Sequence, residues 1–164
     1  MHSQILAPVV ALVAWSLVML VWMMAIRLPA LKKAGIDMSK ARGGRPGILD
    51  GMVDERVQWP AHNYIHLMEQ PTLFYAICLA LALLGGGDGI NAWIAWAYVG
   101  LRILHSLVQA TFNKVAVRFG LFVLSTFALV ALTLHGDASR APAAGYSRQT
   151  RSRPRHWGDS PSGR

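Results

Sequence analysis

The sequence has little cysteine and little charge. Its 164 residues include a single cysteine, Cys78, so no disulfide can form within the chain, and thiol redox chemistry is not indicated. Only 15% of the residues are charged, whereas 54% are hydrophobic, and the apolar residues gather into long runs instead of alternating with polar ones. This composition argues against a soluble domain and indicates a membrane protein.

The longest stretch without charge predicts a first membrane span. Residues 5–26 contain no charged side chain, and their number matches the roughly 20 residues that an α-helix needs to cross the hydrocarbon core. A cleaved signal peptide would carry basic residues before its apolar run, but here Arg27, Lys32 and Lys33 follow it. We therefore expect this segment to be retained.

Three more apolar segments complete a predicted four-helix transmembrane domain over residues 1–135. They cover residues 59–84, 90–112 and 115–134; the second span ends at the sequence GGGDG, and the last two lie close enough to form an antiparallel hairpin. Since helices satisfy their own backbone hydrogen bonds in lipid, the predicted fold class is all-α. The connection over residues 28–58 is long enough to cap a site, and residues 136–164, rich in Arg, Ser and Pro, are expected to be a disordered tail.

The basic residues predict an orientation. The net charge is +8, and seven basic residues lie between Arg27 and Arg56, followed later by Lys114 and Arg118, whereas residues 85–91 contain none. By the positive-inside rule, the first and third connections face the cytoplasm and both termini lie on the other side. Because these charges are explained as topology signals, nucleic-acid binding is not expected.

Two polar stripes interrupt the apolar helices. His62, His66 and Glu69 stand on one face of the second span at i, i+4 and i+7, with Asn63 and Gln70 beside them. The third span carries a stripe at spacings of three and four, made of Tyr98, Arg102, His105, Gln109 and Phe112.

Both stripes should face protein or water, because a charged group deep in lipid costs roughly 2.5–3.5 kcal/mol on insertion scales. Glu69 and Arg102 are predicted to form an ion pair. Pro71, close after Glu69, is expected to loosen or kink the helix beside that carboxylate.

The stripes alone allow several functions. They could form a structural ion pair in an inert scaffold, a proton path in a transporter where Glu69 titrates, or a site for a charged cofactor. His62, His66 and Glu69 have helical metal-ligand spacing, which His105 could complete, but no HExxH motif or cysteine pair supports a metal. A haem between His66 and His105 rests on two histidines only, so we expect neither metal nor haem.

Longer motifs on these segments resemble a known family. The sequences HLMEQPTLFYAICLALALLGG and WAYVGLRILHSLVQATFNKVAVRFGLFVLS, within residues 59–134, resemble the bacterial branch of the MAPEG family, the membrane-associated proteins in eicosanoid and glutathione metabolism. The pairing of ExPxLFY with RxLHSxxxxxxN is more specific than either motif alone. The resemblance implies a multi-pass bundle in a bacterial inner membrane that assembles as a homotrimer.

The same resemblance implies a glutathione S-transferase or peroxidase acting on hydrophobic electrophiles from the bilayer. Glutathione would bind between subunits near the cytoplasmic face, and Arg118 would be the catalytic residue that stabilises its thiolate. The alternatives are a small proton-coupled transporter using Glu69 and a non-catalytic scaffold. The residues expected to bind glutathione are Asn63, His66, Glu69, Arg102, His105 and Gln109.

The sequence departs from the family pattern at four of these or nearby positions. His66 stands where members have an asparagine, and His62 where they have an arginine. Gln109 and Phe112 stand where many bacterial relatives have histidine and tyrosine.

Overall fold

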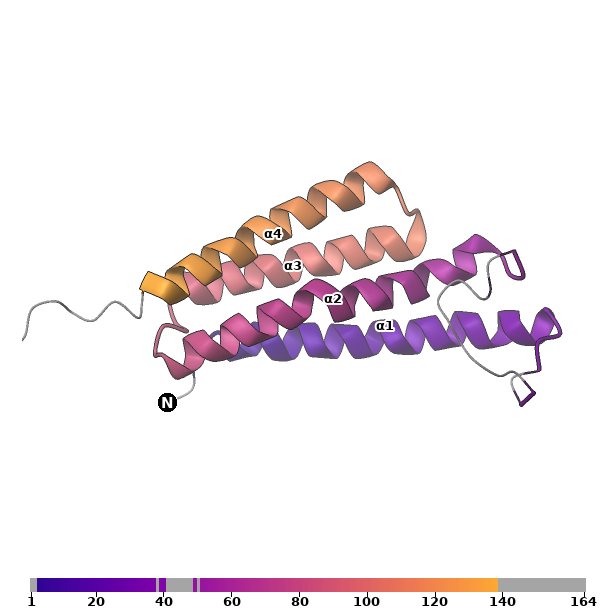
Figure 1. The fold of residues 1–164 in the computed structure, drawn as a ribbon, viewed down its shortest axis with the longest axis horizontal. Coiled ribbons are helices and arrows are strands. Elements are labelled where there is room, and N and C mark those ends of the chain that lie inside the picture. The colour runs from indigo at the N-terminus through magenta and orange to yellow at the C-terminus, as the bar shows by residue number, and fades with distance from the viewer. Residues whose placement is uncertain (1–2, 38, 41–48, 50, 139–164) are drawn as a thin grey trace, which may run out of the picture.

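The computed structural model describes residues 3–37, 39–40, 49 and 51–138. This part of the chain contains four helices and no strand, as the all-α prediction requires. The helices are α1 (Leu6–Lys33), α2 (Glu55–Leu83), α3 (Ile90–Thr111) and α4 (Val115–Ala138), as Figure 1 shows.

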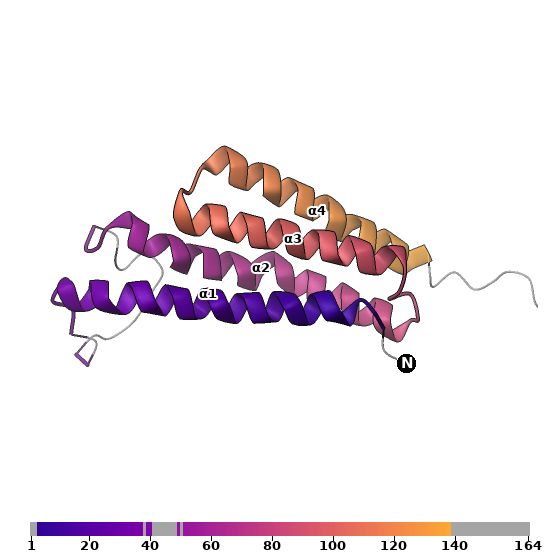
Figure 2. The same cartoon turned by 180° about the vertical axis from the view of Figure 1, so that it is seen from behind.

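The central pair of the bundle is α2 and α3. The first helix packs against both of them, the fourth packs against both from the other side, and within the described residues α1 and α4 do not touch. The α2–α3 turn lies at the same end as the N-terminal segment, and the α3–α4 turn lies at the opposite end, where α1 ends and α2 begins (Figures 1 and 2). The central position of α2 and α3 means that each of them contacts three other helices.

The helices run beyond the apolar segments that predict them. The first continues to Lys33 and the second begins at Glu55, where the Asp54 carboxylate accepts the Arg56 backbone N–H at 2.8 Å. The connection thus spans residues 34–54, shorter than the predicted 28–58, and its residues 38, 41–48 and 50 lie outside the described residues. The last helix includes residues 136–138, and the rest of the predicted tail also lies outside the described residues.

A glycine turn joins α2 to α3, as the GGGDG sequence predicts. Gly85 and Gly89 have φ angles of +77° and +62°, which favour glycine. The backbone N–H of Ile5 donates to the carbonyl of Gly87 at 2.9 Å, so the start of the chain is fastened to this turn. A Cβ added to Gly87 would lie 2.0 Å from Ser3 Oγ, so only glycine fits there without a shift.

Three of the helical segments are long and apolar enough to cross a membrane by length and composition: α1, α2 and residues 115–136 of α4. The third helix is not among them, because its polar stripe lowers its mean hydropathy. Large apolar side chains are nevertheless exposed on every helix, including Val10, Leu73, Trp93 and Phe127. Such a surface suits lipid and not water. The protein is an integral membrane protein, and a count of four spans stays a prediction.

Candidate functional site

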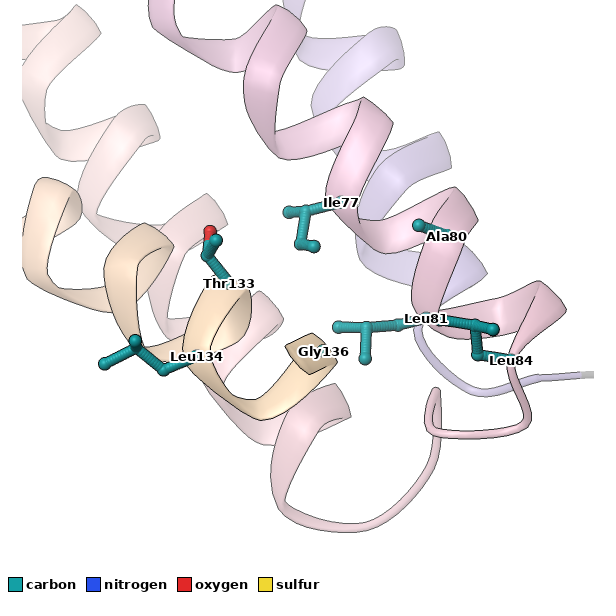
Figure 3. Close-up of a pocket in the computed structure, with 7 residues that line it drawn as sticks. All are labelled: Ile77, Ala80, Leu81, Leu84, Thr133, Leu134 and Gly136. Atoms are coloured by element: carbon teal, nitrogen blue, oxygen red, sulfur yellow. The ribbon is translucent and has the colours of Figure 1, made fainter. Parts of the chain in front are cut away.

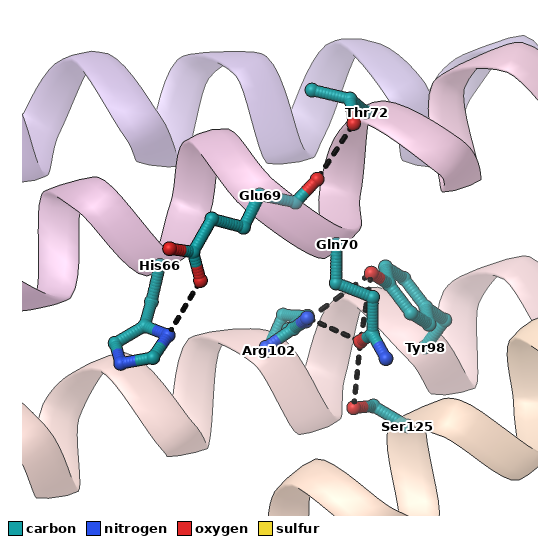
Figure 4. Close-up of polar contacts among 7 residues, drawn as sticks. All are labelled: His66, Glu69, Gln70, Thr72, Tyr98, Arg102 and Ser125. Carbon is teal, nitrogen blue, oxygen red and sulfur yellow. Dashed lines mark hydrogen bonds and ion pairs between the residues drawn. The ribbon is translucent and has the colours of Figure 1, made fainter.

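A group of polar side chains in the middle of the bundle joins three helices (Figure 4). The Gln70 Oε1 on α2 accepts a hydrogen bond from Arg102 Nη2 on α3, and Gln70 Nε2 donates to Thr126 Oγ1 on α4 at 2.8 Å. Arg102 Nε also donates to the Tyr98 hydroxyl at 3.2 Å, and Ser125 Oγ, which donates to the Phe122 carbonyl at 2.9 Å, lies 3.4 Å from Gln70 Oε1. Gln70 therefore connects all three helices through one side chain.

The predicted ion pair between Glu69 and Arg102 is wrong within this chain. Arg102 is 1% exposed and bonds to neutral acceptors, whereas the Glu69 carboxylate lies 3.0 Å from His66 Nδ1. Neighbouring residues of a helix point about 100° apart, so when Gln70 faces the interior Glu69 cannot. Two aromatic rings also stabilise the charge of Arg102 through cation–π contacts. Its guanidinium carbon lies 5.6 Å from the Tyr98 ring centroid and 5.7 Å from that of Phe122.

Glu69 and His66 lie on an open face of α2. Their side chains are 59% and 40% exposed, although both belong to a helix long and apolar enough to span a membrane. A carboxylate facing acyl chains is costly, so this face needs water, a polar ligand or another protein surface against it. His62, one turn earlier, is exposed as well.

His66 connects this open face to a buried part of the third helix. The rings of His66 and His105 meet edge to face, with centroids 6.1 Å apart, and His105 is only 4% exposed. His105 also lies within electrostatic reach of Arg102 and Arg118. Within the described residues, no three His, Cys, Asp or Glu side chains are grouped so that they could hold a metal ion.

Several buried polar atoms near these histidines in the sequence have no hydrogen-bond partner in the described part of the chain. Asn63 is completely buried and both of its amide atoms are unpaired, as are Ser106 Oγ and Gln109 Oε1. Each such group costs roughly 1–3 kcal/mol when nothing satisfies it. A polar ligand or bound water would supply the missing partners.

The predicted catalytic residue lies at the start of α4. Arg118 is half-buried, its Nη1 donates to Asn113 Oδ1 at 2.5 Å, and its Nε is buried without a partner. The neighbouring Lys114 is exposed. Of these two basic residues, Arg118 is the one whose side chain is held in one orientation by a hydrogen bond.

Sequence reasoning did not assign roles to Gln70, Ser125, Thr126 or Asn113. The hydroxyl pair Ser125 and Thr126 could have been noticed, because it interrupts the apolar sequence of α4. Gln70 was recognised only as a neighbour of the stripe, and no spacing rule distinguishes it from Glu69 as the partner of Arg102.

An apolar cavity of about 380 Å³ also opens between α2 and α4 (Figure 3). Its lining includes Ile77, Leu81, Leu134 and Gly136. It lies near the ends of α2 and α4, whereas Arg118 stands at the beginning of α4. This cavity is therefore separate from the polar site.

The fold and the site define a class: a helical membrane protein that keeps a polar interior between its central helices and presents an acidic side chain on an outer, apolar face. The sequence profile of the MAPEG family matches residues 5–136, and the chain belongs to this family. Its members are membrane proteins with glutathione-related transferase, peroxidase or related activities. Comparison with curated proteins and with solved structures finds no match.

Proposed function

We propose that the protein binds glutathione between neighbouring copies of itself and uses it to conjugate or reduce hydrophobic electrophiles from the bilayer. The observation that carries this proposal is the open face of α2, where the Glu69 carboxylate is 59% exposed on a membrane-spanning helix. A second copy packed over this face would remove the carboxylate from lipid and enclose a polar site. A closed homotrimer is the assembly that we propose.

Glutathione has groups that match the side chains available there. Its ammonium group suits the exposed Glu69 carboxylate, and its amide groups suit the unpaired amides of Asn63 and Gln109, which are buried in the single chain and would have to open toward the ligand. His66 and His105 offer ring nitrogens beside these groups. Arg102 donates hydrogen bonds to Gln70 and Tyr98 and so holds α2 and α3 together. Its effect on glutathione is therefore indirect, through the position of these two helices.

Arg118 activates the thiol in this proposal. Only the thiolate is a good nucleophile, and a guanidinium beside the sulfur stabilises it while the thiol proton leaves to water. In conjugation, the sulfur forms a bond to an electrophilic carbon, and a leaving group departs with the bonding electrons. In reduction of a hydroperoxide, two glutathione molecules are oxidised to one disulfide, and the hydroperoxide becomes an alcohol and water.

The experiment is calorimetry of glutathione binding to the purified protein in detergent, together with turnover of an apolar aryl halide. We expect Glu69→Gln to weaken binding by about tenfold, the equivalent of one lost charged contact. We expect Arg118→Ala to lower kcat by tenfold or more and to change the affinity much less, because its charge acts on the thiolate. Glu55→Gln, in the first turn of the same helix, is the matched control and should bind normally.

Different results would support other functions. If the folded wild type does not bind glutathione, the proposal fails. Proton flux into liposomes that disappears in Glu69→Gln and ignores glutathione would indicate a transporter. If Glu69→Gln changes only the assembly state, the protein is a scaffold.

A further inference from the structure

The turn between α3 and α4 depends on an unusual residue. Asn113 has a φ angle of +49°, and it is the one non-glycine residue with positive φ in the described part of the chain. Its backbone N–H donates to the Val108 carbonyl at 2.8 Å, which closes the end of α3. Asparagine tolerates this left-handed conformation better than most residues do, so the backbone here favours Asn or Gly.

The side chain of Asn113 has a second contact that the turn itself does not require. Its Oδ1 accepts a hydrogen bond from Arg118 Nη1 at 2.5 Å, five positions along the chain. The contact holds one edge of the guanidinium toward the turn. Arg118 Nε is buried and has no hydrogen-bond partner among the described residues, so the contact with Asn113 is the hydrogen bond that fixes the direction of this guanidinium.

We propose that Asn113 is a positioning residue, which orients the Arg118 guanidinium so that its positive charge lies beside the glutathione sulfur. This inference rests on the proposed function. An amide suits the task because it is neutral: it fixes the guanidinium and leaves its full positive charge for the sulfur anion. A carboxylate at the same place would hold Arg118 as well but would neutralise that charge.

Two variants separate these effects. Asn113→Gly keeps the left-handed backbone accessible and removes the acceptor. Asn113→Asp keeps an acceptor of the same shape and adds a negative charge. Thr111→Ala is the matched control, since it removes another hydrogen bond at the end of α3, from Thr111 Oγ1 to the Leu107 carbonyl, without touching Arg118.

The test is calorimetry with two glutathione derivatives on the full-length protein in detergent. S-methylglutathione has no charge on sulfur, whereas glutathione sulfonate carries a permanent anion there, so the ratio of their affinities measures the stabilisation of the anion. We expect the wild type and Thr111→Ala to favour the sulfonate by about tenfold, which corresponds to one charge-assisted contact. Both Asn113 variants should lose most of this preference and still bind S-methylglutathione within about twofold of the wild type.

A kinetic measurement separates positioning from a structural role. With an aryl halide as acceptor, the apparent pKa of the thiol in the dependence of kcat on pH should rise in Asn113→Gly and rise further in Asn113→Asp. The double variant with Arg118→Ala should be no slower than Arg118→Ala alone, because Asn113 acts through that residue.

The results distinguish two failures. If neither derivative binds to the wild type, the proposed function is overturned. If both bind and Asn113→Gly keeps the wild-type sulfonate preference and pH profile, the positioning role is overturned while glutathione binding stands. The positioning role is also overturned if the Asn113 variants lose thermal stability but keep the wild-type affinity ratio and pH profile.

Discussion

At the scale of single residues, Gln70 supplies the central hydrogen bonds of the polar group inside the bundle. Its amide accepts a hydrogen bond from Arg102 on α3 (Figure 4) and donates one to Thr126 on α4, so it joins these two helices. Removing it would leave a buried guanidinium with the Tyr98 hydroxyl as its remaining hydrogen-bond partner within the described residues. Losing a buried hydrogen bond between a charged and a neutral group typically costs about 1.5–3 kcal/mol.

We therefore predict that Gln70→Leu lowers the free energy of unfolding by roughly 2 kcal/mol and lowers the melting temperature in detergent, which circular dichroism measures. Gln70→Glu is the control, because a carboxylate can still accept from Arg102 and should keep most of the stability. A Gln70→Leu variant as stable as the wild type would mean that Arg102 finds other partners.

The difference between Glu69 and Gln70 also shows the limit of prediction from sequence at this scale. The polar stripes of α2 and α3 were predictable, because residues three and four apart share a helical face. Which of two adjacent polar residues faces Arg102 depends on the rotation of α2 against α3. That rotation is set by packing such as the stacking of Phe74 on Tyr98, with ring centroids 4.3 Å apart, and no local motif encodes it.

At the scale of elements, the helices were predictable from their apolar runs, but their ends were not. Hydropathy changes at the membrane boundary, whereas a helix ends where its capping and turn residues stop it. The α1 helix therefore passes its apolar run and continues to Lys33. In contrast, the α2–α3 turn was predictable, because glycine adopts positive φ angles without strain and the sequence GGGDG supplies glycines where the helix ends.

That turn supplies a prediction about stability. Gly87→Ala should destabilise the protein by about 1–3 kcal/mol, because its new Cβ would meet Ser3 Oγ and Ile5 Cγ2 where the N-terminal segment is fastened. Gly100→Ala is the control, since a Cβ there meets nothing within 4 Å. Thermal melts of the two variants, compared with the wild type, measure the difference. Equal melting temperatures would show that the N-terminal segment yields without cost.

At the scale of the whole molecule, α3 differs from the other three helices in its hydropathy. Its polar residues Tyr98, Arg102, His105 and Gln109 are buried against other helices, while Trp93 and Leu104 are exposed. The low mean hydropathy of α3 thus reflects groups that lipid would not contact in the folded bundle. We expect α3 to span the membrane in the company of its neighbours, which gives four spans.

Cysteine labelling tests this topology. In spheroplasts, a membrane-impermeant maleimide should label Leu84→Cys, while Lys33→Cys and Lys114→Cys should react only after lysis, because the positive-inside rule places those two residues in the cytoplasm. The native Cys78 is completely buried and serves as an unreactive control. Labelling of Lys114→Cys from outside would mean that α3 does not cross.

The burial of Arg102 without a carboxylate has a further consequence, for permeability. The Arg102 guanidinium places a fixed positive charge inside the bundle, where it is 1% exposed and hydrogen-bonded to the neutral side chains of Gln70 and Tyr98. In selective pores, a single arginine of this kind raises an electrostatic barrier against protons and other cations. Arg102, which organises the polar interior, would then also prevent protons from passing through that interior. The membrane could keep its ion gradient although the protein places many polar residues within it.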